Sequence, residues 1–169
     1  MKLHIGGEIA KEGWTIFNIQ KKKNVDIIGD LENLDQFSEN SIGEIYASHV
    51  FEHIKIGNFL KILKNIHRIL KQDGKLYISV PDMDIIFRLF LNPKATPSVK
   101  FTLMKMIFGG QVDKHDFHYF GWNYEFMADF LTKANFSKFR RVESLEIFDD
   151  TSELKAYGNK ISLNMIAVK

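Results

Sequence analysis

The chain has 169 residues, which is enough for one compact domain with its own core and too few for two. Its 45% apolar content excludes a disordered or fibrous chain, and the lack of cysteine excludes disulfides and thiolate metal sites. The formal net charge is only +2, and the single short basic run, Lys21–Lys23, does not form the broad basic face expected of a nucleic-acid-binding protein. No apolar run approaches the ~20 residues of a membrane span. We therefore expect a cytoplasmic protein without nucleic-acid or membrane partners.

Short runs of β-branched and aromatic residues, each bounded by turn residues, predict the strands of this domain. In chain order they are Lys2–Ile5, Thr15–Ile19, Val25–Ile28, Glu44–Ser48, Lys75–Val80, Phe139–Glu143 and Ile161–Val168. A polar stretch, residues 149–160, precedes the last run and is expected to be a loop.

Apolar residues at helical spacing from Phe59 to Leu70 predict a helix between the fourth and fifth strands. Asn58 is its expected N-cap and Asp73-Gly74 its expected stop and turn. Three further helices are expected at Asp84–Leu91, Val99–Phe108 and Asn123–Ala134, the last capped by Asn123.

A strand, a helix and a second strand in succession imply a right-handed crossover between parallel strands. The pattern thus predicts an α/β fold, a Rossmann-like doubly wound sheet in a single domain over residues 1–169, with a helical insertion over residues 84–110. Ligands bind such sheets beyond the carboxyl ends of the strands, near the reversal in strand order. The candidate site residues at the predicted strand ends are Gly6-Gly7, Asn18, Asp30, Ser48-His49 and Pro81-Asp82.

An ordered set of segments covers nearly the whole chain and resembles a known family. The segments are Lys2–Gly7, Gly13-Trp14, Ile28–Leu31, Ile45–Ile54, Arg68–Asp82, Gly109–Gln111, Asp116–Trp122 and Ile161–Lys169. Together they resemble the class I S-adenosylmethionine-dependent methyltransferases, within them a compact group of the type 11 kind. The resemblance implies a sheet of seven strands, the last antiparallel, and S-adenosylmethionine as the cofactor.

Carried over position by position, the resemblance also implies a cofactor site. Its residues are Ile5, Gly6, Gly7, Asn18, Asp30, Leu31, Ser48 and His49. The first three would line the methionine end, where glycine lets the backbone approach a ligand closely. Asn18 stands where the family usually has an acid that binds the ribose hydroxyls. Asp30 and Leu31 would hold the adenine, and Ser48 and His49 would border the methyl group and the acceptor.

Two departures from the family pattern keep an alternative open. The glycine motif is reduced to Gly6-Gly7-Glu8, followed by a link of roughly nine residues in which a full helix hardly fits. Asn18 is neutral, so it lacks the charge-assisted bond that an acid would make. The alternative is a degenerate member that binds the cofactor weakly or not at all and serves as a binding or interaction module.

Three histidines are the candidate catalytic residues: His49, His53 and His118. Imidazole titrates near neutrality and can remove a proton from an acceptor hydroxyl or amine. The alternatives to a catalytic role are structural: Glu52 and His53 would cap the turn after the fourth strand, and His118 would lie in an ordinary surface loop.

The run His49-Val-Phe-Glu-His53 also matches the H-x-x-E-H pattern of inverted zinc peptidases. That pattern needs both histidines on one helix, whereas His49 leaves a predicted strand, so we do not expect peptidase chemistry. We also assign no metal ligands from the sequence, although one metal-binding alternative stays open. Some RNA-modifying methyltransferases of this fold hold a divalent ion with an acid-x-x-Glu-His cluster at this position. Here His49 replaces the first acid, and Asp116 or His118 could complete the site.

The resemblance implies transfer of a methyl group to a small-molecule or sugar-type acceptor by in-line displacement, catalysed mainly by proximity and orientation. The apolar surface of the helices around residues 85–91 and 101–108 is more than a small domain easily covers. These helices are expected to form a lid over the acceptor, a homodimer contact or ordinary core.

Overall fold

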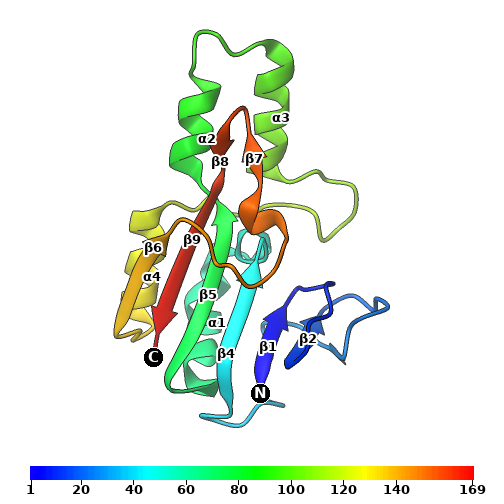
Figure 1. Cartoon of the computed structure of the whole chain (residues 1–169), viewed down its shortest axis with the longest axis vertical. Coiled ribbons are helices and arrows are strands. Elements are labelled where there is room, and N and C mark those ends of the chain that lie inside the picture. Colours follow the sequence, from blue (N-terminus) through cyan, green and yellow to red (C-terminus); the bar gives the residue numbers. More distant parts are fainter.

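The computed structural model describes residues 1–169 and is built on a seven-stranded sheet with the order β3-β2-β1-β4-β5-β9-β6 (Figure 1). The strands are β1 (Lys2–Ile5), β2 (Trp14–Asn18), β3 (Ile27–Ile28), β4 (Ile42–Ser48), β5 (Leu70–Pro81), β6 (Lys138–Val142) and β9 (Ser162–Val168). The pairs from β3 through β5 are parallel, and β9 runs antiparallel to both of its neighbours, β5 and β6. The predicted sheet, mostly parallel with the last strand antiparallel, is confirmed.

The strand order reverses between β1 and β4. The chain builds outward from β1 to β2 and β3, then returns to place β4 on the other side of β1. The carboxyl ends of β1 and β4 therefore diverge into links that run to opposite sides, which leaves a crevice between them.

Side chains alternate between the two faces of the central strands, as the period of a strand requires. In β4, Ile45 and Ala47 belong to the main core, whereas Tyr46 points to the opposite face and packs with Leu145 and Phe148. Two helices, α1 (Ile56–Ile69) and α4 (Tyr124–Lys133), cover the main-core face (Figure 1). The opposite face is covered by the segment that follows β6.

A helical pair, α2 (Met83–Phe90) and α3 (Pro97–Phe108), stands beyond the carboxyl end of the sheet (Figure 1). It has a small core of its own, formed by Met83, Ile86 and Leu103. None of the helices is long and apolar enough to cross a lipid bilayer.

Several local expectations are corrected by the structure. Helix α1 begins one turn earlier than expected, with Lys55 at its N-cap position. Asn58 does not cap it, because its amide instead donates a 2.8 Å hydrogen bond to Glu32 Oε1. Asp73-Gly74 does not end the helix either. It lies inside β5, where Asp73 has a left-handed backbone (φ 59°) and the pairing with β4 is irregular.

The links that join β1, β2, β3 and β4 carry no helix. Residues 6–13 between β1 and β2 form only turns, as their short length led us to expect. The predicted loop over residues 149–160 is more regular than expected. It contains a 3₁₀ turn, η2 (Thr151–Glu153), and a ribbon of β7 (Lys155–Ala156) and β8 (Asn159–Lys160).

Candidate functional site

A cleft of about 730 Å³ opens where the strand order reverses. Its floor and walls come from the ends of β1, β2 and β4, from the turn after β3 and from a loop between α3 and α4. Its size falls within the ~300–1,000 Å³ of small-molecule sites. This position, at the carboxyl edge beside the reversal, is the one that the sequence predicted.

Most of the predicted cofactor residues meet in this cleft. Those that line it are Ile5, Gly6, Asn18, Asp30, Leu31 and His49. Gly6 has a left-handed backbone (φ 71°), and a Cβ there would come within 2.5 Å of the Val50 side chain, so only glycine fits this turn.

Gly7 and Ser48 do not line the cleft. A Cβ on Gly7 would overlap the imidazole of His4, on the far side from the cleft, so Gly7 is required by packing. The hydroxyl of Ser48 lies 3.4 Å from that of Thr151, under the segment that covers the second face of the sheet.

Both polar atoms of the Asn18 side chain form hydrogen bonds with the backbone. Its amide donates to Gly7 O at 3.2 Å, and its Oδ1 accepts from Gln20 N at 2.9 Å. These bonds fasten the turn after β1 to the end of β2. Each atom has capacity for one further hydrogen bond, so a contact with a ligand hydroxyl is compatible with this structural role.

Asp30 and Leu31 form the opposite wall. Asp30 Oδ1 accepts from Glu32 N at 2.9 Å, which fixes the turn and leaves Oδ2 free at the cleft. Leu31 is 8% exposed and belongs to the main core, so it offers a small apolar surface on a rigid support.

His49 is held in place from three sides. Its backbone is left-handed (φ 52°) and its N–H donates to Ser79 O at 2.8 Å. Its Nε2 lies 3.0 Å from Ser162 Oγ, and its Nδ1 lies 3.2 Å from Glu52 Oε1. Burial alone would lower the pKa of His49, but the carboxylate of Glu52 outweighs it and raises the pKa. In a charged His49, Nε2 therefore bonds to Ser162 Oγ and Nδ1 forms the ion pair with Glu52.

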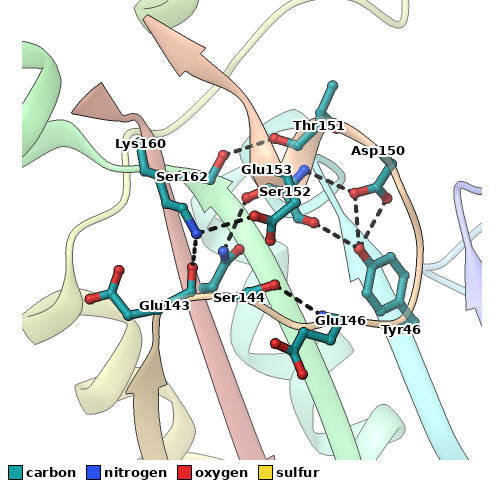
Figure 2. A network of polar contacts seen from close by, with 11 residues as sticks. Tyr46, Glu143, Ser144, Glu146, Asp150, Thr151, Ser152, Glu153, Lys160 and Ser162 are labelled. Atoms are coloured by element: carbon teal, nitrogen blue, oxygen red, sulfur yellow. Dashed lines mark hydrogen bonds and ion pairs between the residues drawn. The ribbon is translucent and has the colours of Figure 1, made fainter. Parts of the chain in front are cut away.

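Ser162, the partner of His49 Nε2, belongs to a polar network on the second face of the sheet (Figure 2). Its hydroxyl donates to Thr151 O at 3.0 Å. Next to it, the Tyr46 hydroxyl lies 3.0 Å from both carboxylate oxygens of Asp150 and 3.2 Å from Ser152 Oγ. The network ties residues 150–152 to the ends of β4 and β9. No periodic or motif signal predicts this network, because its members are residues of two strands and of the predicted loop that are far apart in sequence.

Glu52 is a buried carboxylate on the 3₁₀ turn η1 (Phe51–His53), with only 1% of its surface exposed. Apart from the ion pair with His49, its side chain has no polar partner, and neither carboxylate oxygen accepts a hydrogen bond. Burial favours a raised pKa, but His49, with smaller contributions from His53 and His118, holds the pKa of Glu52 below its usual value.

His53 and His118 lie next to Glu52, with ring centroids 4.7 Å apart. His53 Nδ1 lies 3.1 Å from Phe117 O, and His118 Nδ1 lies 3.0 Å from Met106 O. A carbonyl only accepts, so each Nδ1 is the protonated nitrogen. Burial lowers the pKa of His118, although Glu52 opposes this. In the neutral ring, Nε2 then keeps a free lone pair.

The structure selects between the two downstream residues that could join this group. His118 does: donor atoms of Glu52, His53 and His118 all lie within 4.8 Å of one another. Asp116 does not, because its carboxylate accepts from Val112 N within its own loop. The peptidase-like reading of H-x-x-E-H fails, since His49 follows a strand and His53 lies on a 3₁₀ turn. One helix does not carry both.

Comparison with known proteins shows that the fold is similar to that of methyltransferases. Residues 5–78 match the family model described as a methyltransferase domain. No curated protein sequence matches the chain.

Solved structures with a similar fold cover 99% of this chain. One is an S-adenosylmethionine-dependent methyltransferase from Thermotoga maritima, described as a possible histamine N-methyltransferase (TM-score 0.62, 18% identity, 81% of that chain). Another is an S-adenosylmethionine-dependent methyltransferase from Archaeoglobus fulgidus (0.59, 16%, 85% of that chain). A third is the 1,6-didemethyltoxoflavin-N1-methyltransferase from Burkholderia thailandensis, solved with its acceptor and S-adenosylhomocysteine (0.56, 16%, 70% of that chain). The chain spans about half, 51%, of a further structural relative from Nostoc punctiforme.

Proposed function

We propose that this chain, a class I methyltransferase domain of the type 11 kind, binds S-adenosylmethionine in the cleft and methylates a small-molecule acceptor. The observation that carries the proposal is the position of the cleft. It lies at the strand-order reversal and brings together the turn after β1, the Asp30-Leu31 wall and the histidines after β4.

The residues present fit the cofactor. Asp30 Oδ2 can accept from the exocyclic amine of adenine beside the apolar surface of Leu31. The left-handed turn at Gly6 exposes backbone at the floor of the cleft, where it can contact the methionine end. Asn18 can add one hydrogen bond to the ribose without losing its own contacts. When bound, the cofactor supplies an electrophilic methyl group on a sulfonium.

The chain's own part is to position the reactants and exclude water, which accounts for much of the catalysis of an in-line displacement. The acceptor is expected at the end of the cleft lined by His49, His53 and Tyr119. His49 is unsuited to remove a proton, because Glu52 and Ser162 occupy both of its nitrogens. It acts instead as a rigid support. A small-molecule acceptor fits a cleft of this size better than a polymer, since a broad basic surface is missing from a chain with net charge +2.

Calorimetric titration with S-adenosylhomocysteine tests cofactor binding. We expect one ligand per chain and at least about a tenfold loss of affinity in Asp30→Ala, because a hydrogen bond to a charged group contributes about 1.5–3 kcal/mol. Asp35→Ala is the matched control, since Asp35 is exposed and lies outside the cleft. Absence of binding at millimolar ligand, or equal affinity in both variants, would contradict the proposal.

The acceptor class is tested with methyl-labelled cofactor in a fractionated cell extract. Label in the small-molecule fraction that depends on active protein is the expected result. Label confined to protein or nucleic acid would refute the acceptor part of the proposal and leave the cofactor part intact.

A further inference from the structure

The group Glu52, His53 and His118 presents an unusual combination of donors beside the cleft. Its carboxylate is buried without a hydrogen bond, and one ligand atom of each imidazole lies within 4.8 Å of a carboxylate oxygen. Because each Nδ1 bonds to a backbone carbonyl, Nε2 is the nitrogen that remains free in each ring. A buried carboxylate with unfilled acceptor capacity costs free energy unless something pairs with it. His49 meets this need only in part, because its Nδ1 lies near one oxygen, at 3.2 Å and outside hydrogen-bond geometry.

The two imidazoles have the orientation that metal-binding histidines usually have. A histidine that binds a metal through one nitrogen typically donates the N–H of the other to a carbonyl or carboxylate, which fixes its tautomer. His53 and His118 do this through Phe117 O and Met106 O. Phe117 lies in the loop after α3 and Met106 lies within α3, so two independent carbonyls fix the two imidazoles in the same way.

Backbone bonds also hold the three residues together. Tyr119 N donates to Glu52 O at 2.8 Å, and His118 N donates to Phe108 O at 3.1 Å. The loop that carries His118 is thereby fastened to η1 and to the end of α3. The group is thus a formed site and not a chance encounter of mobile side chains.

We infer that Glu52, His53 and His118 bind one divalent transition-metal ion through the carboxylate and the two Nε2 atoms. Two imidazoles and a carboxylate suit zinc, manganese or iron better than magnesium or calcium, which prefer oxygen ligands throughout. Tetrahedral ligand atoms about 2.1 Å from an ion lie about 3.4 Å apart. The donors lie within 4.8 Å of one another, so each pair needs to approach by at most about 1.4 Å, which small side-chain rotations supply.

The three proposed ligands leave part of the metal's coordination sphere free, on the side of the cleft. Three protein ligands leave at least one coordination position unfilled, and His53 lines the cleft. If the cleft is the methyl-transfer site, as proposed above, the open position faces the acceptor end. A ring nitrogen that binds a metal cannot accept a proton, so the ligand role replaces the base role that the sequence suggested for His53 and His118.

The test is calorimetric titration of tag-free, chelator-treated protein with Zn²⁺ and with Mn²⁺, and absorption spectroscopy with Co²⁺. We expect one ion per chain in the wild type. Loss of an outer hydrogen-bond partner already costs 10–100-fold in metal affinity, so His53→Gln and His118→Gln should each weaken binding by more than about 100-fold. His115→Gln is the matched control, since His115 lies in the same loop but outside the group.

Several outcomes would overturn the inference: no binding by the wild type, binding that survives in both His53→Gln and His118→Gln, or an equal loss in His115→Gln. Because Glu52 is buried, Glu52→Gln is informative only where circular dichroism shows a folded chain. The test is therefore decided by His53→Gln and His118→Gln, since both histidines are only half-buried. Titration with S-adenosylhomocysteine in parallel separates the two claims. Metal binding without cofactor binding would refute the proposed function alone, and the reverse would refute the metal site alone.

Discussion

His4 should make the stability of the fold depend on pH. It lies in β1 on the second face of the sheet, 3% exposed, against Phe148 (ring centroids 4.1 Å apart) and Tyr46 (5.1 Å). Burial lowers the pKa of His4 to about 4, although the charge of Asp150 opposes this. The folded state is therefore more stable with a neutral His4 ring than with a protonated one.

The direction of this pH dependence follows from the linkage between proton binding and folding. A histidine with a lowered pKa in the folded state binds a proton more readily when unfolded, so its contribution is fully present above about pH 6.5 and is lost as the pH falls toward 4. A shift from 6.5 to about 4 corresponds to roughly 3 kcal/mol at 1.36 kcal/mol for each pKa unit. This is a large share of the ~5–15 kcal/mol by which domains are stable.

Urea denaturation of the wild type and of His4→Phe, at several pH values between 7 and 4, measures this term. The difference between the two free energies of unfolding should change by roughly 3 kcal/mol in favour of the variant on going from pH 7 to pH 4. Taking the difference removes the contributions of other titrating groups, such as Glu52 and His118. A difference that stays constant over this range would refute the account of His4.

Two further substitutions test the packing around the site. Arg141→Met removes the partner of Asp82, a carboxylate that is 0% exposed and accepts a 2.6 Å bond from Arg141 Nη2. It should destabilise the fold by about 3 kcal/mol in urea denaturation, and a change below about 0.5 kcal/mol would show that the pair is dispensable. Gly7→Ala places a methyl group on the imidazole of His4 and should lower the free energy of unfolding by about 1–3 kcal/mol. Restoration of stability by a smaller side chain at position 4 would confirm the clash, and equal stability of Gly7→Ala and wild type would contradict it.

Much of the sheet could be predicted from sequence because its signals are local. The buried parallel strands are short apolar runs, and Asn123 precedes its helix with a side chain that does cap it, accepting from Phe126 N at 3.0 Å. Asn58 carries the same local signal and fails as a cap. Its partner, Glu32, lies far away in sequence and could not be found by inspecting the helix alone.

The site divides in the same way. Strand-end residues such as Gly6 and Asp30 were placed at the cleft by topology and family resemblance. The hydrogen-bond partners of individual side chains were not predictable, since they depend on contacts between residues far apart in sequence. Neither the bond from His49 to Ser162 nor the convergence of His118 on Glu52 leaves a mark in the spacing of residues. Only the fold shows that His118 joins the group and Asp116 does not.

The account centres on the cleft as the place where the methyl donor binds, and a crystal structure of the chain with S-adenosylhomocysteine tests this most directly. We predict density for the adenine beside Leu31 and Asp30, and for the sulfur between the turn at Gly6 and His49. Ligand density at another place, or an empty cleft in crystals grown with millimolar ligand, would contradict the account.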